Sequence, residues 1–306
     1  MLRTFLLAGA AVGIAFSASA KDLKSIGVTV GSLGNPYFVA VSKGITDAGH
    51  AINPNAKITV TSADYDLNKQ FTQIDNFISA GVDLILVNAA DARAIAPAIK
   101  RAQAAGIAVV AVDVAAAGAD ATVQTDNIKA GELACQYMAD KIDHKGNVVI
   151  ENGPQVSAVI DRVTGCKNVL AKYPDIKLLS SDQDAKGSRD GGMNAMQGYL
   201  TRFPELAGVF AINDPQAIGS DLAAKQLNRS GIVITSVDGA PDIVAALKGP
   251  TQIQASSSQD PYTMGKLAVE TGKAIMDGKK LENSMILMVP TLVTRDTVGS
   301  YPGWTR

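Results

Sequence analysis

Short apolar runs alternate with longer amphipathic stretches along most of the chain, and this alternation limits the possible folds more than any other feature. The runs at 84–87 (Leu-Ile-Leu-Val) and 109–112 (Val-Val-Ala-Val) are apolar at every position, which is typical of parallel strands buried on both faces. The stretches between such runs have helical length and period, as in Leu67–Ala80. Nine segments are expected to be strands: Ser25–Val30, Lys57–Thr61, Leu84–Asn88, Ala108–Asp113, Asn147–Glu151, Lys177–Ser181, Gly208–Ile212, Ile232–Val237 and Gln252–Ser256.

Length and composition favour two α/β domains. With 306 residues, the chain can bury a large core and is long enough for about two domains. Aromatic residues make up only 5% of the chain, which favours α/β layers over a β-sandwich. Nine strands could also close into one barrel, but a barrel needs eight similar units. A break near Thr122–Asn127 and a late strand near Leu287–Val289 instead predict two doubly wound parallel sheets joined by several crossings. The tail after Thr291 is expected to pack in extended form.

The first twenty residues have the pattern of a secretory signal peptide. Arg3 precedes an apolar run at 5–16, and the small residues of 18–20 precede Lys21. Cleavage would leave a chain that begins at Lys21 and works in the periplasm. The alternative is an uncleaved membrane anchor, but the run is shorter than the roughly 20 apolar residues that a span needs.

Charge and cysteine content narrow the function further. The formal net charge is −1, without a clustered basic excess, which argues against a nucleic-acid partner. The two cysteines, Cys135 and Cys166, both lie in helical patterns. In an oxidising compartment this pair is expected to form a disulfide between neighbouring helices; the alternative is two buried free thiols.

Polar residues recur where the apolar strands end, namely Asn88, Asp113, Asn213, Asp214 and Asp238. In open α/β sheets, ligands bind beyond the carboxyl ends of the strands. One such residue is usually a helix N-cap, but five in both halves of the chain indicate a binding site. Amides and carboxylates suit a ligand that carries many hydroxyl groups.

The segment after the first expected strand adds a second candidate group. Asn35 and Pro36 have the pattern of a helix N-cap followed by the first helical residue, and Tyr37 and Phe38 come next. In a chain with few aromatic residues, these two rings could present a flat apolar face to a ligand. The alternative is ordinary core packing.

Motifs for catalysis and cofactor binding are missing from the sequence. His50 and His144, the only histidines, are expected in exposed turns, so a Ser-His-Asp triad and a histidine metal site both lack a component. The sequence has no H-E-x-x-H or C-x-x-C motif, no dinucleotide-binding G-x-G-x-x-G and no phosphate-binding loop. We therefore expect a binding protein rather than an enzyme, with no cofactor and no metal.

Several of these motifs occur in a fixed order along the chain. They are Asn-Pro-Tyr-Phe at 35–38, the strand-ending Asn88 and Asp113, Thr-Asp-Asn at 125–127, Phe-Ala-Ile-Asn-Asp at 210–214, Val-Asp-Gly at 237–239 and the segment around Gln259. From Lys24 to Thr291 the chain resembles the periplasmic ribose-binding-protein group, the substrate-binding proteins of sugar ABC importers. The resemblance implies a type I periplasmic binding protein fold, in which two Rossmann-like lobes joined by a three-segment hinge clamp a sugar. The implied lobes are 21–124 plus 260–289, and 125–259 plus 290–306.

The resemblance also implies a set of ligand-binding residues and the partners of the protein. The set is Asn35, Tyr37, Phe38, Asn88, Asp113, Arg162, Asn213, Asp238 and Gln259. The guanidinium fork of Arg162 would bond two oxygen atoms of the ligand; the alternative for Arg162 is a surface ion pair on a helix. The implied protein is a monomer that binds a sugar or polyol and delivers it to the membrane permease of an ABC importer.

The chain departs from the family pattern at two positions near the site. The ribose binders carry an arginine directly after the aspartate at 113, where this chain has Val114, and an aromatic residue that several members have near Gly187 is also absent. The missing arginine removes donors to the sugar ring oxygens and puts ribose in doubt. The expected ligand is a pentose, a hexose or a sugar alcohol, and the missing arginine favours a linear polyol.

Two other function classes stay open at this point. A secreted carbohydrate-active enzyme would need two carboxylates that flank the scissile bond, for which Asp113 and Asp238 are the candidates. A LacI-type ligand-sensing protein would need an N-terminal helix-turn-helix, where this chain has the signal-peptide pattern.

Overall fold

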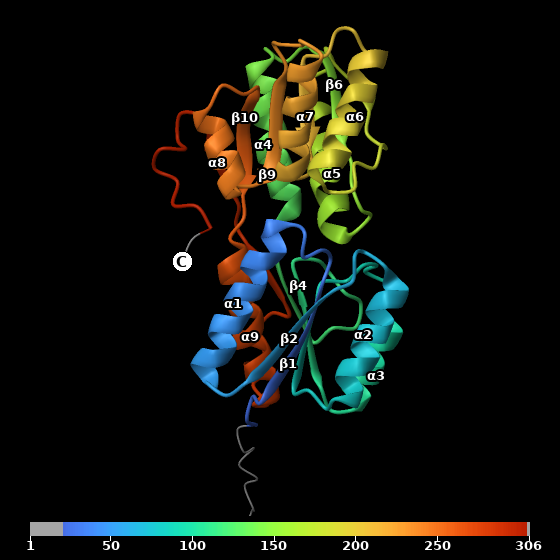
Figure 1. The fold of residues 1–306 in the computed structure, drawn as a ribbon, viewed down its shortest axis with the longest axis vertical. Coiled ribbons are helices and arrows are strands. Elements are labelled where there is room, and N and C mark those ends of the chain that lie inside the picture. The colour runs from blue at the N-terminus through green and yellow to red at the C-terminus, as the bar shows by residue number, and fades with distance from the viewer. Residues whose placement is uncertain (1–20, 305–306) are drawn as a thin grey trace, which may run out of the picture.

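Two six-stranded sheets, each covered by helices on both faces, form the two lobes seen in Figure 1. The computed structural model describes residues 21–304, so the predicted signal peptide at 1–20 lies outside the described residues. The first sheet has the order β11-β5-β4-β3-β1-β2, with bounds β1 Ser25–Val30, β2 Lys57–Ser62, β3 Leu84–Val87, β4 Ala108–Val112, β5 Ala121–Thr125 and β11 Met285–Met288. The second has the order β12-β10-β9-β8-β6-β7, with bounds β6 Gly146–Glu151, β7 Ile176–Ser180, β8 Gly208–Ala211, β9 Val233–Asp238, β10 Ile253–Ser258 and β12 Thr291–Thr294.

The helices pack on the sheets in pairs and triplets. In the first lobe, α1 (Pro36–Ile52) and α9 (Pro261–Met276) cover one face, and α2 (Leu67–Ser79) and α3 (Ala96–Ala104) cover the other. In the second lobe, α4 (Asn127–Lys141) and α5 (Ser157–Leu170) lie opposite α6 (Arg189–Arg202), α7 (Asp214–Gln226) and α8 (Pro241–Lys248). Within residues 21–304, every helix falls short of the length and hydrophobicity that a membrane span needs.

The apolar runs of the sequence explain why the central strands are parallel and buried. Each residue of β3 is buried, and alternate residues of β6 serve opposite faces: Val148 and Ile150 pack under α4 and α5, and Val149 packs under α6 and α7. In both sheets the strand order reverses at one point, between β1 and β3 and between β6 and β8. Ligands of open α/β sheets bind at such switch points, beyond the carboxyl ends of the strands.

The structure confirms the nine expected strands to within about two residues at their ends, and the expected α/β class. The sequence pattern missed β5 (Ala121–Thr125), whose polar residues are buried between β4 and β11, and the break expected near 122–127 falls at the end of this strand, where the chain continues into α4. The tail after Thr291 was expected only to pack in extended form. In the structure, Thr291–Thr294 forms the strand β12, which pairs antiparallel with β10. His50 lies in the last turn of α1 rather than in a turn between elements, whereas His144 does lie in an exposed turn.

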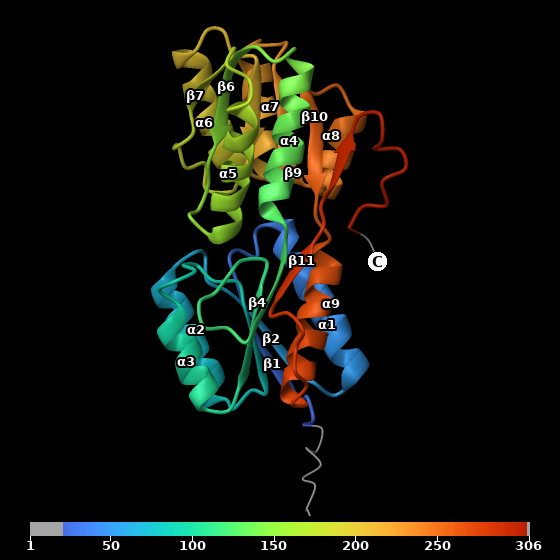
Figure 2. The same cartoon turned by 180° about the vertical axis from the view of Figure 1, so that it is seen from behind.

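Three chain segments connect the lobes, and Figure 2 shows them passing through the waist of the molecule. They run from β5 to α4, from β10 to α9 and from β11 to β12. All three leave or enter strands at the facing edges of the sheets, so the lobes meet where the parallel strands end.

Helices α4 and α5 are held unusually close together. A disulfide joins Cys135 to Cys166 with a Cα–Cα distance of 5.1 Å, as expected from the sequence. A Cβ atom at Gly131 would collide with the carbonyl of Arg162, and one at Gly165 would collide with the carbonyl of Ile128, so only glycine permits this approach. The crossing therefore fixes the position of the α5 turn that carries Arg162.

Candidate functional site

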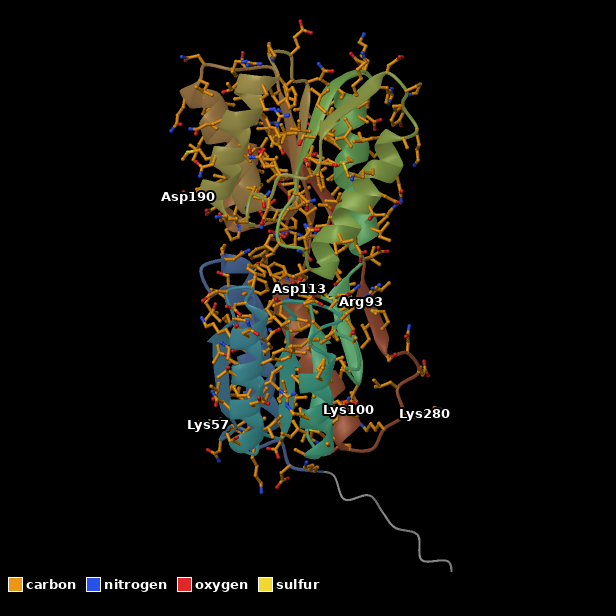
Figure 3. The ribbon with its side chains drawn as sticks, turned by 90° about the vertical axis from the view of Figure 1, so that its right-hand side faces the viewer. Lys57, Arg93, Lys100, Asp113, Asp190 and Lys280 are labelled. Atoms are coloured by element: carbon orange, nitrogen blue, oxygen red, sulfur yellow. A yellow bond between two sulfur atoms is a disulfide. The ribbon has the colours of Figure 1, made fainter. Side chains whose placement is uncertain are left out.

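A small cavity of about 40 Å³ lies where the carboxyl ends of the two sheets face each other. All nine residues expected at a ligand site line it: Asn35, Tyr37, Phe38, Asn88, Asp113, Arg162, Asn213, Asp238 and Gln259. Asp113, labelled in Figure 3, lies at the edge of the first lobe that faces the second lobe.

In the first lobe, the side chains converge on Asp113. The Asn35 side chain caps α1 by accepting a hydrogen bond from the Tyr37 backbone N–H at 3.0 Å, which directs the Tyr37 ring into the cleft. The Tyr37 hydroxyl donates to Asp113 Oδ1 at 2.8 Å. Asn88 donates from Nδ2 to Asp113 Oδ2 at 2.9 Å. Asp113 itself has a φ of +70°, a conformation that is uncommon for a residue with a side chain and places its carboxylate beyond β4.

In the second lobe, Arg162 is the central cation. Its side chain is only 6% exposed, so the alternative of a surface ion pair is wrong. Arg162 donates from Nε to Asn127 Oδ1 at 2.8 Å and from Nη1 to the Ile212 carbonyl at 2.9 Å, and Nη1 lies 3.5 Å from Asp238 Oδ1. These contacts orient the guanidinium toward the cavity.

Asn213 and Gln259 make different contacts at the edge of the second sheet that faces the first lobe. Asn213 caps α7 by accepting from the Gln216 N–H at 3.1 Å, and its Nδ2 donates to the Gly187 carbonyl at 2.9 Å. Gln259 lies on a lobe crossing and donates from Nε2 to Asp238 Oδ1 at 2.8 Å, while its Oε1 lies 3.3 Å from the Tyr37 hydroxyl, which shares its single proton between Gln259 and the closer Asp113. Gln259 therefore joins the polar groups of both lobes into one network.

Burial changes the acid–base properties of the site. It raises the pKa of Asp238 to about 6, although the nearby Arg162 guanidinium opposes the rise. Burial likewise raises the pKa of Asp113, again against the effect of Arg162. Burial and the Asp113 charge raise the pKa of the Tyr37 hydroxyl, so Tyr37 remains a hydrogen-bond donor.

Several polar atoms at the cavity are left without partners. Within residues 21–304, no hydrogen bond within the protein involves Asn35 Nδ2, Asn88 Oδ1 or Arg162 Nη2. They provide two donors and one acceptor beside two carboxylates. Alternating donors and acceptors of this kind match the hydroxyl groups of a sugar or polyol.

Sequence reasoning missed the apolar wall of the cavity and one tyrosine. The wall residues are Pro154, Val156, Ala158, Val159, Gly187 and Ile212. Most of these residues follow β6, at the same edge of the sheet as the polar residues. The end of β6 could therefore have indicated them, but their side chains are apolar and do not mark a binding site in the sequence. Tyr65, with a φ of +58°, lies against Gly31, and a Cβ atom on Gly31 would come within 2.6 Å of its ring. No sequence pattern indicates that ring.

The site has little that could support catalysis or hold a metal. In the part of the chain that the structure describes, no cluster of histidine, cysteine and acidic residues is arranged to hold a metal ion. Both candidate carboxylates of a hydrolase are already hydrogen-bonded, Asp113 to Tyr37 and Asn88 and Asp238 to Gln259. The geometry therefore fits recognition of a ligand.

Comparison with known proteins agrees with this geometry. A family model described as periplasmic binding protein domain matches residues 26–280. The ribose import binding protein of Bacillus subtilis is 34% identical over 267 residues, covering 85% of this chain and 84% of the relative. The xylitol-binding protein of Mycolicibacterium smegmatis is 34% identical over 292 residues, covering 94% of this chain and 82% of the relative.

A solved structure has the same fold over nearly its full length. It is an ABC transporter solute binding protein from Mycobacterium smegmatis with bound glycerol, and it superposes with a TM-score of 0.85 at 26% identity, covering 92% of this chain and 97% of that one. The family matched here is made up of binding proteins that work with ABC importers. This chain belongs to the periplasmic binding protein domain family.

Proposed function

We propose that this protein is an extracytoplasmic solute-binding protein that clamps a monosaccharide or sugar alcohol between its lobes and delivers it to an ABC-transporter permease. The observation that carries the proposal is the single buried network from Asn88 through Asp113, Tyr37 and Gln259 to Asp238, which spans both lobes. Neither lobe alone supplies enough donors and acceptors to replace the water around a polyhydroxylated ligand.

Within this class, the residue after Asp113 favours a sugar alcohol. Val114 is 1% exposed and apolar, so the donors of an arginine are absent beside the carboxylate. A flexible polyol can turn its hydroxyl groups toward the acceptors that remain, whereas a ring sugar presents its groups at fixed angles. The similarity to a xylitol-binding relative and to a glycerol-bound structure supports this class.

The proposal also covers the compartment in which the protein acts, its lobe boundaries and its oligomeric state. The mature protein would begin at Lys21, act in the periplasm as a monomer, and have no enzymatic activity, cofactor or metal. Its lobes would be residues 21–124 plus 260–289 and residues 125–259 plus 290–306, hinged near Thr125, Gln259 and Val289.

A thermal-shift screen of pentoses, hexoses and sugar alcohols, with product analysis of every hit, tests the proposal. We expect at least one polyol to raise the unfolding temperature more than D-ribose does, and to be recovered unchanged. Conversion of the hit into a product would favour the enzyme alternative. A screen in which no sugar or polyol shifts the transition would contradict the proposed function.

A further inference from the structure

The segment that follows β12 leaves the second lobe as an extended loop and returns to the level of the cleft (Figures 1 and 2). The last residue of this segment that the structure describes is Trp304, the only tryptophan of the chain, which is 7% exposed. The indole belongs to the apolar cluster of the first lobe, with Tyr37 and Met264, although the chain reaches it from the second lobe. The chain after β12 therefore buries one large ring between the two lobes.

Trp304 contacts ligand-site residues of both lobes. Its Nε1–H donates a hydrogen bond to the backbone carbonyl of Asp238 at 2.8 Å. Its ring meets the Tyr37 ring edge to face, with 5.7 Å between centroids. Tyr37 in turn donates to Asp113, so one indole lies behind the polar groups of the first lobe and of the second.

The Asp238–Gly239 turn depends on this segment. Asp238 has a φ of +138° and Gly239 a φ of +73°, and a positive φ is costly for a residue with a side chain unless its surroundings hold it. The Tyr301 hydroxyl donates to the Gly239 carbonyl at 3.1 Å, next to the bond from Trp304 to the Asp238 carbonyl. The segment therefore holds the backbone that aims the Asp238 carboxylate into the cavity.

We propose that residues 301–304 form a latch that fixes the Asp238 turn and holds the two lobes together through the contact between Trp304 and Tyr37. Trp304 is tied to β9 by its hydrogen bond and to β12 by the chain, so it moves with the second lobe. Opening the cleft then separates the indole from the Tyr37 ring, and the latch shifts the equilibrium toward the closed state before a ligand binds. Its effect on affinity rests on the proposed function, whereas its effect on the shape of the protein does not.

Three variants of the mature protein test the latch. Trp304→Ala removes both contacts. Trp304→Phe keeps a ring against Tyr37 but loses the N–H donor, and remains informative if the alanine variant does not fold. Phe203→Ala is the matched control, because Phe203 is a partly buried aromatic residue that stacks on Tyr199 in the second lobe. We would measure small-angle scattering without ligand, and the affinity for xylitol and D-ribose by calorimetry.

We expect Trp304→Ala to have a larger radius of gyration than the wild type without ligand, and an affinity about tenfold weaker for whichever probe the wild type binds. Trp304→Phe should keep the wild-type radius and bind a few times more weakly. A wild-type radius for Trp304→Ala, or an equal increase for Phe203→Ala, would overturn the latch. If Trp304→Ala does not fold, an unchanged affinity of Trp304→Phe overturns it. If the wild type binds neither probe, the scattering data still decide on the latch, and the wider thermal-shift screen decides on the proposed function.

Discussion

At the scale of single residues, the site places two carboxylates and one guanidinium in a nearly water-free space. Asp113, Arg162 and Asp238 are each at most 6% exposed. Buried charges are costly unless they are paired and hydrogen-bonded, and here the pairing is incomplete, because Arg162 Nη2 has no partner within residues 21–304 and the ion pair with Asp238 is 3.5 Å long. Hydroxyl groups of a ligand would complete it.

Ligand affinity should depend on the ionisation of Asp238. Burial raises the pKa of this carboxyl to about 6, and the charged form is the better acceptor for a ligand hydroxyl, so affinity should fall as the pH drops through about 6. Asp238→Asn should weaken binding by about 1.5–3 kcal/mol at pH 7.5 and flatten this pH profile. Calorimetry between pH 5 and 8 measures both effects, with the exposed Asp242→Asn as control. The same pH profile in wild type and Asp238→Asn would contradict the assignment.

Glu151 should make the protein less stable at alkaline pH. Burial raises the pKa of this carboxyl from 4.5 to about 8, and its Oε2 atom has no hydrogen-bond partner. Between these values the folded state holds a proton that the unfolded state has lost, so the free energy of unfolding falls as pH rises, by about 1.4 kcal/mol per pH unit for this group.

Glu151→Gln should remove this pH dependence. The amide keeps the shape of the protonated carboxyl, so we expect the variant to gain stability relative to wild type at pH 8 and little at pH 4.5. Urea unfolding at the two pH values measures the difference, and the exposed Glu205→Gln is the control. An equal stability difference at both pH values would disprove the role of Glu151.

At the scale of elements, the strands were easier to predict than the site. Short runs that are apolar at every position favour strands buried on both faces, so β3 and β4 could be predicted from the sequence pattern. β5 carries Thr and Gln and β12 carries Thr at both ends, and their pairing is decided by strands far away in sequence. The nine candidate residues that line the cavity could be named from the sequence because strand ends and family motifs mark them. Tyr65 and Trp304 could not, because their positions depend on the path of a loop around the finished fold.

The disulfide between α4 and α5 should form in exported protein. Thiol titration under denaturing conditions should find no free thiol, because the structure pairs both cysteines. The bridge closes a loop with a sequence separation of 31, so the double variant Cys135→Ser with Cys166→Ser should lose about 3–4 kcal/mol of unfolding free energy. Two titratable thiols in exported wild-type protein would rule the bridge out.

The close approach of α4 and α5 should control ligand binding through Arg162. In Gly131→Ala the new methyl group would collide with the Arg162 carbonyl and push α5 away, so we expect weaker ligand binding as well as lower stability. Gly198→Ala on α6 is a matched control, because its Cβ would lie 4.0 Å from the nearest side-chain atom, and it should leave affinity unchanged. Wild-type affinity in Gly131→Ala would show that the crossing does not position Arg162.

At the scale of the whole molecule, the buried site implies that the lobes move apart to admit a ligand. In this closed arrangement the ligand groups of both lobes face each other and are shielded from water. Without a ligand, opening hydrates the charges of Asp113, Arg162 and Asp238, while closing preserves the Trp304 latch. A ligand adds hydrogen bonds only when both lobes reach it, and this difference in affinity shifts the population toward the closed state.

The wild-type protein should therefore contract when it binds its sugar or polyol. We expect a smaller radius of gyration at saturating ligand than in its absence, with the change absorbed near Thr125, Gln259 and Val289, where the three crossings lie. Asp238→Ala should fold normally but show no contraction at the same ligand concentration, because its second lobe has lost the charged acceptor. Small-angle scattering of both proteins, with and without ligand, provides the measurement. A wild-type radius that is unchanged at saturation would rule out clamping, since a rigid cleft cannot both admit a ligand and bury it between these groups.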